Sequence, residues 1–218
     1  CVAFDFDEVI ASFLAGFAKH TKRMYPHSNL EPDRMLYYHP GYDPSVNLTV
    51  REFEHAWETF TPLAKGGYGD IPVIGNIIEQ MKQIRSAGIR IKIITHVPGA
   101  SSVTPTDGAP IHTGMARNVR LIMAKAIGLP LDSENDLEFV DPHKKRQWMA
   151  ENYVPLLVED SFANAASAAE WGFAVLLVPT SYNRGFKCPN VKRLTSRTEL
   201  AQAVIEFFTE LADRDLLR

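Results

Sequence analysis

Five short apolar runs place the strongest constraint on how this chain folds. Each run is rich in β-branched residues and nearly continuous, instead of alternating between apolar and polar positions. Such runs are typical of strands that are covered on both faces of a sheet. The runs occupy residues 1–5, 90–95, 137–140, 154–159 and 174–179. They therefore predict a central sheet with helices on either side.

Amphipathic helical patterns fill the stretches between these runs. Apolar residues recur every three or four positions in residues 74–87, and Gly88 ends that pattern. Further helices are predicted over residues 115–127, 142–152, 164–171 and 196–216. Strands that alternate with helices indicate an α/β class, with a doubly wound, Rossmann-like parallel sheet. Sheets of this kind bind ligands at the carboxyl ends of their strands.

One long segment, residues 11–72, interrupts this alternation. It contains no convincing core strand, and two helical stretches flank a loop rich in Pro, Tyr, Asp and His. We therefore predict a small α-helical cap insert over residues 11–72. The remaining residues, 1–10 and 73–218, would form the core, with the cap over its ligand-binding edge.

Composition narrows the classes of function. The chain has 218 residues and 45% hydrophobic content, enough for a core with a small insert. A formal net charge of -3 argues against an extended nucleic-acid surface. With Cys1 and Cys188 as its 2 cysteines, the chain has no disulfide framework, which favours a reducing, cytoplasmic location. No apolar run approaches the roughly 20 residues of a membrane span, so no membrane partner is expected.

Asp5 and Asp7 stand at the end of the first apolar run, two residues apart. Two carboxylates this close repel each other unless a cation or a proton lies between them. A hard divalent cation with oxygen ligands, such as Mg²⁺, meets that requirement. The pair taken by itself is equally consistent with two surface acids at a strand end.

Polar residues also follow the other predicted strands. Thr95 ends the second run, Glu159 and Asp160 end the fourth, and Lys144 and Lys145 begin the helix between residues 142 and 152. Because the carboxyl ends of parallel strands meet at one edge, these side chains are expected to converge there. Acids, a hydroxyl and an amine at one edge predict a site for a phosphate group.

With these residues in place, the sequence resembles the haloacid dehalogenase superfamily of phosphatases. The first motif of that family, D-x-D-x-[T/V] after an apolar strand, is matched by residues 5–9. Thr95 matches the second motif, Lys144 or Lys145 the third, and the pair at residues 159–160 the fourth. The sequence departs from the pattern at Glu8, where many members have Gly, and in opening the fourth motif with Glu instead of Asp.

The resemblance implies a mechanism and a set of roles. Asp5 would attack phosphorus, and Asp7 would serve as general acid and base. Thr95 would hydrogen-bond a phosphate oxygen, and a lysine, with Lys144 preferred, would neutralise its charge. The expected ligands of Mg²⁺ are Asp5, Asp7 through its backbone carbonyl, Asp160 and Glu159. Glu159 would either ligate the ion through water or orient the lysine.

The cap should decide which phosphoester is bound, and its layout resembles that of 5'(3')-deoxyribonucleotidases. The resemblance implies nucleoside monophosphates as substrates. The residues expected to bind them are His96, Lys145, Phe13, Phe17 and Trp57. Equally, the aromatic side chains could pack the cap's own core. A polynucleotide 3'-phosphatase, a phosphatase of another small metabolite and a catalytically silent binding module stay open as alternatives.

Overall fold

The computed structural model describes residues 1–37, 40–60, 71–95, 121–122 and 124–214. Its centre is a six-stranded sheet in the order β3-β2-β1-β4-β5-β6, and every neighbouring pair is parallel. The strands are β1 Val2–Phe4, β2 Ile91–Thr95, β3 Leu137–Phe139, β4 Leu156–Glu159, β5 Ala174–Leu177 and β6 Val191–Arg193. The predicted doubly wound, Rossmann-like sheet is confirmed, and the strand order reverses beside β1.

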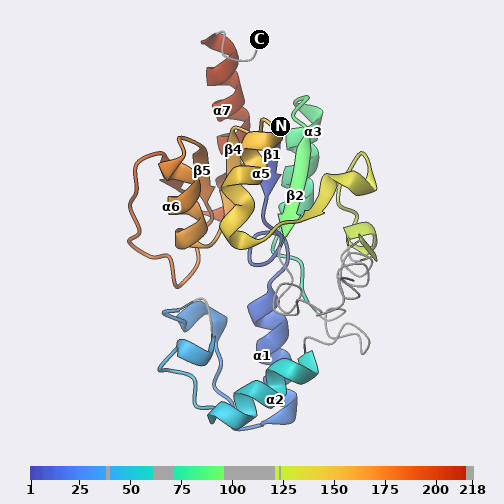
Figure 1. Cartoon of the computed structure of the whole chain (residues 1–218). Helices are drawn as coiled ribbons and strands as arrows, with labels where there is room; N and C mark the ends of the chain where they lie inside the picture. Colours follow the sequence, from blue (N-terminus) through green and yellow to red (C-terminus); the bar gives the residue numbers. More distant parts are fainter. Residues whose placement is uncertain (38–39, 61–70, 96–120, 123, 215–218) are drawn as a thin grey trace, which may run out of the picture.

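Helices cover both faces of this sheet (Figure 1). On one face lie α3 Ile77–Ser86 and α7 Leu200–Asp213, which contact each other. On the other lie α5 Lys145–Glu151 and α6 Phe162–Glu170. Successive residues of β1 are buried in opposite layers, Val2 and Phe4 in one cluster and Ala3 in the other. Burial on both sides explains why the strand sequences are apolar at nearly every position.

The structure differs from the predictions in one strand and in the start of one helix. β6 was not predicted, because it is short, carries Lys192 and Arg193, and pairs with β5 on one side only. Edge strands commonly carry charged side chains, which hides them from a search for apolar runs. The helix predicted over residues 115–127 lies largely outside the described residues. The helix predicted from residue 142 is a 3₁₀ turn, η6 Pro142–Lys144, followed by α5.

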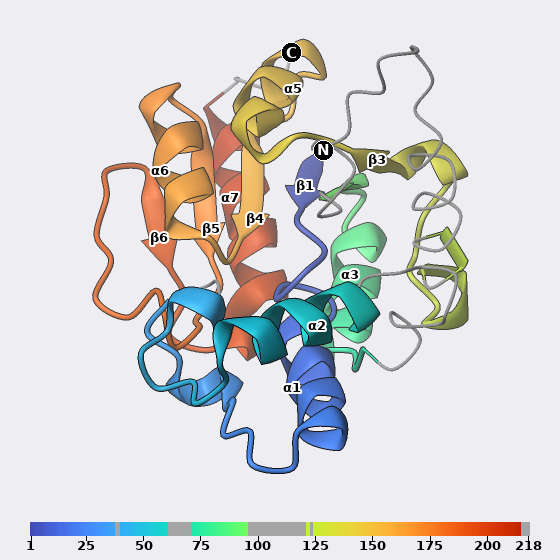
Figure 2. The same cartoon turned by 60° about the horizontal axis from the view of Figure 1, so that its bottom comes forward.

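Between β1 and α3 the chain forms the cap, which lies beyond the carboxyl edge of the sheet (Figures 1 and 2). It contains α1 Phe13–Met24, α2 Val50–Phe60 and two short 3₁₀ turns, η1 Pro32–Arg34 and η2 Pro40–Tyr42. The helices α1 and α2 pack through one aromatic cluster. Its ring centroids lie 5.2–6.3 Å apart, and its members are Phe13, Phe17, Phe53, Trp57 and Phe60.

Two neighbouring chain segments connect the cap to the core. The outgoing and returning chains are held together by Ser12 N–H donating to the Pro72 carbonyl and Ile74 N–H donating to that of Ile10, both at 2.9 Å. Gly16 packs against the returning segment, where a Cβ would lie 3.0 Å from Ile71 Cγ1. The absence of a side chain at Gly16 therefore lets α1 lie directly against the returning segment at Ile71.

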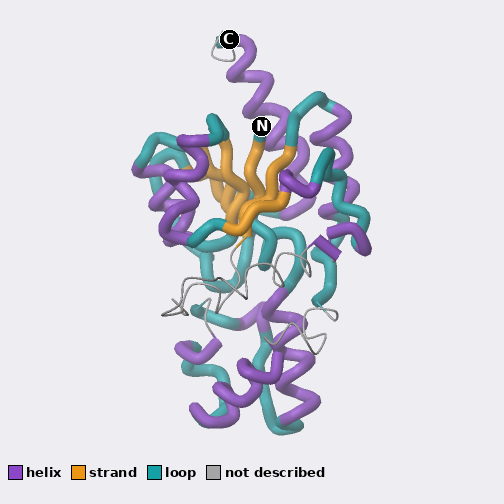
Figure 3. Tube along the Cα trace, turned by 45° about the vertical axis from the view of Figure 1, so that its right-hand side comes forward, coloured by secondary structure: helices purple, strands orange, loops and turns teal. Residues whose placement is uncertain are grey.

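A second contact joins the cap to the core at a distance in sequence from these two connecting segments. Ser181 Oγ, in the loop after β5, donates to the Pro32 carbonyl at 2.7 Å, and Arg184 Nη2 donates to that of Asp33 at 3.4 Å. The tube view shows the cap as a separate helical layer beneath the strand ends (Figure 3). Among the described residues, no helix combines the length and apolar character needed to cross a membrane.

Candidate active site

Asp5 lies immediately after β1, at the centre of the carboxyl edge. Its backbone N–H donates to the Val158 carbonyl at 2.9 Å, which ties the strand end to β4. The N–H of Phe6 donates to Asp5 Oδ1 at 2.8 Å and so fixes the carboxylate. The chain then turns tightly, with the N–H groups of Ile10 and Ala11 both donating to the Phe6 carbonyl. Asp7 is buried inside this turn.

Lys145 joins Asp5 to the end of β4. Its ammonium Nζ lies 3.1 Å from Asp5 Oδ1 and 2.7 Å from Glu159 Oε2, and its side chain is 4% exposed. Burial opposes the charge of this ammonium, but Asp5 and Glu159 outweigh that effect and raise the pKa of Lys145 above its usual value. Lys145 is therefore a fixed positive charge beside Asp5.

The structure places Lys145, and not Lys144, next to Asp5. Lys144 ends η6 and is exposed, whereas Lys145 begins α5 and is buried. Successive helical residues are rotated by about 100° around the axis, so only one of two adjacent lysines can face the sheet. This arrangement differs from the preference for Lys144 and decides between the two candidates on geometry.

Glu159 receives hydrogen bonds from four donors. Oε1 accepts from the N–H groups of Asp160 and Ser161, at 3.2 and 3.1 Å. Oε2 accepts from Lys145 Nζ and from Asn164 Nδ2, at 2.7 and 3.3 Å. A carboxylate offers about four acceptor positions, so Glu159 is saturated. Of its two expected roles, orienting the lysine or ligating the ion through water, the geometry supports orienting the lysine.

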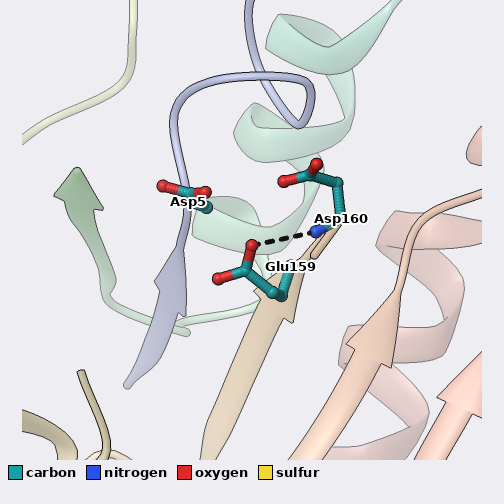
Figure 4. Close-up of side chains that lie close together, drawn as sticks. All are labelled: Asp5, Glu159 and Asp160. Atoms are coloured by element: carbon teal, nitrogen blue, oxygen red, sulfur yellow. Dashed lines mark hydrogen bonds between the residues drawn. The ribbon is translucent and has the colours of Figure 1, made fainter. Parts of the chain in front are cut away.

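Asp160 completes a buried acidic cluster with Asp5 and Glu159 (Figure 4). Each residue contributes a carboxylate oxygen, and these three atoms lie within 4.8 Å of one another. The side chain of Asp7 is not part of this group. If Asp7 binds the same cation, it does so through its backbone carbonyl, as the resemblance to the phosphatase family implies.

The electrostatics of the cluster fit a divalent cation. Burial favours the neutral forms of Asp5 and Asp160, and the nearby Glu159 carboxylate adds to this, so the pKa of each aspartate is raised well above its usual range. By contrast, although burial opposes its charge, Lys145 holds the pKa of Glu159 below its usual value. Hydrogen bonds from Lys145 Nζ and from the N–H of Ser161 also favour the charged form of Glu159.

The cluster brings three carboxylates next to one ammonium, and the guanidinium of Arg197 adds positive charge near Asp160. Two like charges 4 Å apart repel by about 4 kcal/mol at an effective dielectric constant near 20. Among the described residues, nothing donates a hydrogen bond to Asp5 Oδ2 or Asp160 Oδ1. These two oxygens are suitable ligands for an ion such as Mg²⁺, which prefers carboxylate oxygens.

Glu8 connects the tight turn that follows Asp5 to the cap. Its Oε1 accepts from Leu14 N–H at 2.6 Å, and its carboxylate also accepts from Ser12 Oγ, the N-cap of α1. The backbone of Glu8 has a φ of 55°, in the left-handed region that glycine adopts without penalty. This conformation accounts for the Gly that many phosphatases of the resembled family carry here, while the hydrogen bonds of Glu8 offset its backbone strain.

The remaining predicted residues fall into three groups. Thr95 is buried at the end of β2, the strand next to β1 on the side opposite β4. His96 lies outside the described residues. Phe13 and Phe17 are 5% and 0% exposed inside the aromatic cluster of the cap. Such buried rings do not present a face to a substrate, so the two phenylalanines form the cap core; Trp57, in the same cluster, is partly buried.

Sequence reasoning missed two residues that contact the site. Tyr182 O–H donates to Asp160 Oδ2, and Asn183 Nδ2 donates to the Asp160 carbonyl at 2.9 Å. Both follow β5, so the rule that ligand-binding residues follow strand ends could have found them. A Tyr-Asn pair in a loop carries no charge pattern, and for that reason it gave no signal.

Comparisons with known proteins address the fold. No protein-family model matches the sequence, and no curated protein matches it. Among solved structures, a hydrolase of the haloacid dehalogenase family from Deinococcus radiodurans R1, with bound phosphate and sodium, aligns with a TM-score of 0.58 and 17% identity. The alignment covers 94% of this chain and 95% of that one.

Two further solved structures align over similar fractions of both chains. A predicted phosphoglycolate phosphatase from Haemophilus somnus 129pt has a TM-score of 0.54 and 14% identity, covering 93% of this chain and 96% of that one. An L-2-haloacid dehalogenase from Xanthobacter autotrophicus, with chloropropionic acid covalently bound, has a TM-score of 0.54 and 13% identity, covering 93% and 97%. The chain therefore has the fold of the haloacid dehalogenase-like hydrolases, a capped Rossmann-like fold.

The two neighbouring lysines provide a matched test of the buried ion pairs. We expect Lys145→Met to lower the free energy of unfolding in chelator by about 3–5 kcal/mol, because it leaves buried carboxylates unpaired. Lys144→Met should change it by less than about 0.5 kcal/mol, since Lys144 is exposed. Urea unfolding followed by circular dichroism measures both values. Equal effects in the two variants would contradict the placement of Lys145.

Glu8 should make stability depend on pH. Burial raises its pKa from 4.5 to about 7. Between these values the folded state holds more protons than the unfolded state, so the free energy of unfolding falls as pH rises through this window. We expect metal-free protein to lose more stability between pH 5 and pH 8 than the Glu8→Gln variant, as measured by urea unfolding. Identical losses would show that Glu8 does not titrate in this way.

Proposed function

We propose that this chain is a Mg²⁺-dependent phosphomonoesterase that acts through an aspartyl-phosphate on Asp5. One observation carries the proposal: the Asp5 carboxylate is buried at the carboxyl edge of β1, where Lys145 lies between it and Glu159 and where Asp160 completes the acidic cluster. An ammonium, a candidate cation site and a fixed carboxylate are the parts that phosphoryl transfer needs.

The first half of the reaction transfers the phosphoryl group to Asp5. A carboxylate oxygen of Asp5 attacks phosphorus, and the bond from phosphorus to the leaving oxygen breaks. Asp7 donates a proton to that oxygen, so the alcohol leaves in neutral form. The covalent intermediate divides one difficult displacement into two easier ones.

The second half of the reaction hydrolyses the aspartyl-phosphate. Asp7, now deprotonated, takes a proton from a water molecule whose oxygen attacks phosphorus. The bond between phosphorus and Asp5 breaks, which releases inorganic phosphate and restores the carboxylate. Asp7 lies two residues from Asp5 in the same turn, and its charge contributes to raising the pKa of Asp5. That proximity supports its role as the proton carrier.

Lys145 takes the role first expected of Lys144. Its ammonium favours the ionised form of Asp5, as a bound cation would, and offsets negative charge on the phosphoryl group. Glu159 holds the lysine in place, since its Oε2 accepts from Lys145 Nζ and also from Asn164 Nδ2. Thr95, on the neighbouring strand, would hydrogen-bond a phosphate oxygen.

Asp5, Asp160 and the backbone carbonyl of Asp7 would hold Mg²⁺. When bound, the ion would neutralise charge on the phosphoryl oxygens and on the acidic cluster. The raised pKa values of Asp5 and Asp160 support this assignment, since a cation removes the penalty of burying both carboxylates.

Structural likeness does not separate phosphate from halide chemistry, because the similar structures include a dehalogenase. Two features of the chain favour phosphate. A dehalogenase would not need Asp7 as an acid and base, and three buried carboxylates suit a cation that binds phosphate oxygens. Phosphomonoester hydrolysis uses both features.

We expect Asp5→Asn to lose Mg²⁺-dependent release of p-nitrophenol from p-nitrophenyl phosphate, because an amide oxygen is a poor nucleophile. Circular dichroism should show that the fold is retained. Asp213→Asn, a matched change at an exposed position of α7, should keep full activity. Full activity in Asp5→Asn would overturn the mechanism, and unchanged turnover in Asp7→Asn would remove that residue from proton transfer.

We propose nucleoside monophosphates as the substrate class. Its support is the small helical cap over the site, which suits a compact phosphoester, and a net charge of -3, which disfavours a polynucleotide. Because Phe13 and Phe17 pack the cap core, they do not supply the base-binding surface. Trp57, which is only partly buried in the same cluster, is the remaining candidate from the predicted aromatic set.

A phosphate-release screen tests this substrate class. It should cover nucleoside monophosphates, sugar phosphates and 3'-phosphorylated oligonucleotides. We expect kcat/KM for at least one nucleoside monophosphate to exceed that for every sugar phosphate by about tenfold or more, since a specific site rejects substrates that leave its polar groups unpaired. Preference for an oligonucleotide would instead support a polynucleotide 3'-phosphatase, and a flat profile would overturn the nucleotidase proposal.

A further inference from the structure

The loop after β5 contacts both the side chain and the main-chain carbonyl of Asp160. The phenol of Tyr182 donates to Oδ2, and Asn183 Nδ2 donates to the main-chain carbonyl of the same residue. Tyr182, Asn183 and Asp160 are all buried, at 8%, 1% and 1% exposure. Buried hydrogen bonds to a charged acceptor are stronger than exposed ones, so these contacts hold Asp160 firmly.

Asn183 makes this loop a rigid support. Its Nδ2 also donates to the Val178 carbonyl at 2.8 Å, and its Oδ1 accepts from Thr180 N–H and Arg193 Nε, both at 3.1 Å. These bonds join the ends of β4, β5 and β6 to one side chain. The position of the Tyr182 phenol is therefore set by three strands of the sheet.

The phenol has a single proton, and it is directed at one oxygen of Asp160. That bond fixes the plane of the carboxylate and leaves Oδ1 without a donor among the described residues.

We propose that Tyr182 is a positioning residue, which orients the Asp160 carboxylate so that Oδ1 is available to Mg²⁺. The inference rests on the proposed function for the identity of the cation, and it extends that function to a residue outside the four motifs. Hydrogen-bond partners of metal ligands set ligand orientation, and their removal typically costs about 10–100-fold in metal affinity. Tyr182 acts through Asp160 and does not touch the substrate.

Neighbouring residues supply matched controls. Ser181 belongs to the same loop, but its Oγ donates to the Pro32 carbonyl in the cap and not to Asp160. Ser181→Ala therefore removes a contact of the loop while leaving the support of the carboxylate intact. Tyr153, which is 90% exposed, offers the same chemical change as Tyr182→Phe at a site remote from any ligand.

The test compares Mg²⁺ binding to metal-free wild type, Tyr182→Phe, Ser181→Ala and Tyr153→Phe by isothermal titration calorimetry. Phe keeps the buried ring and removes only the hydroxyl. We expect Tyr182→Phe to raise the Kd for Mg²⁺ by about 10–100-fold, with the two controls within about twofold of wild type. The increase in Tm that Mg²⁺ causes should become smaller in Tyr182→Phe. Each variant is compared with its own metal-free form, so a change in the stability of the metal-free protein does not affect the comparison.

Kinetics give a second readout. In Tyr182→Phe the Mg²⁺ concentration for half-maximal activity should rise, while kcat at saturating Mg²⁺ returns towards the wild-type value. A Kd for Mg²⁺ in Tyr182→Phe equal to that of wild type would overturn the positioning role and leave the proposed function intact. Wild-type protein that binds no Mg²⁺ at millimolar concentrations would instead overturn the proposed function, and the positioning role with it.

Discussion

The buried ammonium of Lys145 is the interaction on which the site depends. It lies between Asp5 and Glu159, within hydrogen-bond distance of both. Isolated charges are costly to bury, and each of these groups would be strongly disfavoured in the interior without its partner. The lysine allows an acidic cluster to exist at the centre of an apolar sheet. It neutralises only part of the charge that the three carboxylates can carry.

Sheet register places the partners of this lysine opposite each other. β1 and β4 are parallel neighbours, with Phe4 paired to Val158, so the next residues along the two strands are Asp5 and Glu159. The strand order reverses beside β1, which is the position where sheets of this kind commonly bind ligands. Lys145 reaches this edge from the start of α5. Three elements distant in sequence therefore supply one compact charge arrangement.

The cap is attached to this edge by polar contacts from segments that also carry residues of the candidate site. Glu8 follows the proposed nucleophile and caps α1, and the loop after β5 contacts both Asp160 and the cap carbonyl of Pro32. The aromatic side chains between α1 and α2 stabilise the cap itself. The most deeply buried of these rings, Phe13 and Phe17, therefore contribute to the packing of the cap and present no face to the site.

The sequence by itself determined five of the six strands and the parallel α/β class, because burial on both faces imposes an apolar pattern. It also predicted a cap insert and a set of site residues, since ligand residues follow strand ends. It did not reveal β6, whose edge position allows charged side chains. Only the tertiary structure decided between Lys144 and Lys145, gave Glu159 its lysine-orienting geometry, buried Phe13 and Phe17, and placed Tyr182 beside Asp160. These outcomes depend on which way a side chain points and on what faces it across the fold, and local sequence carries neither.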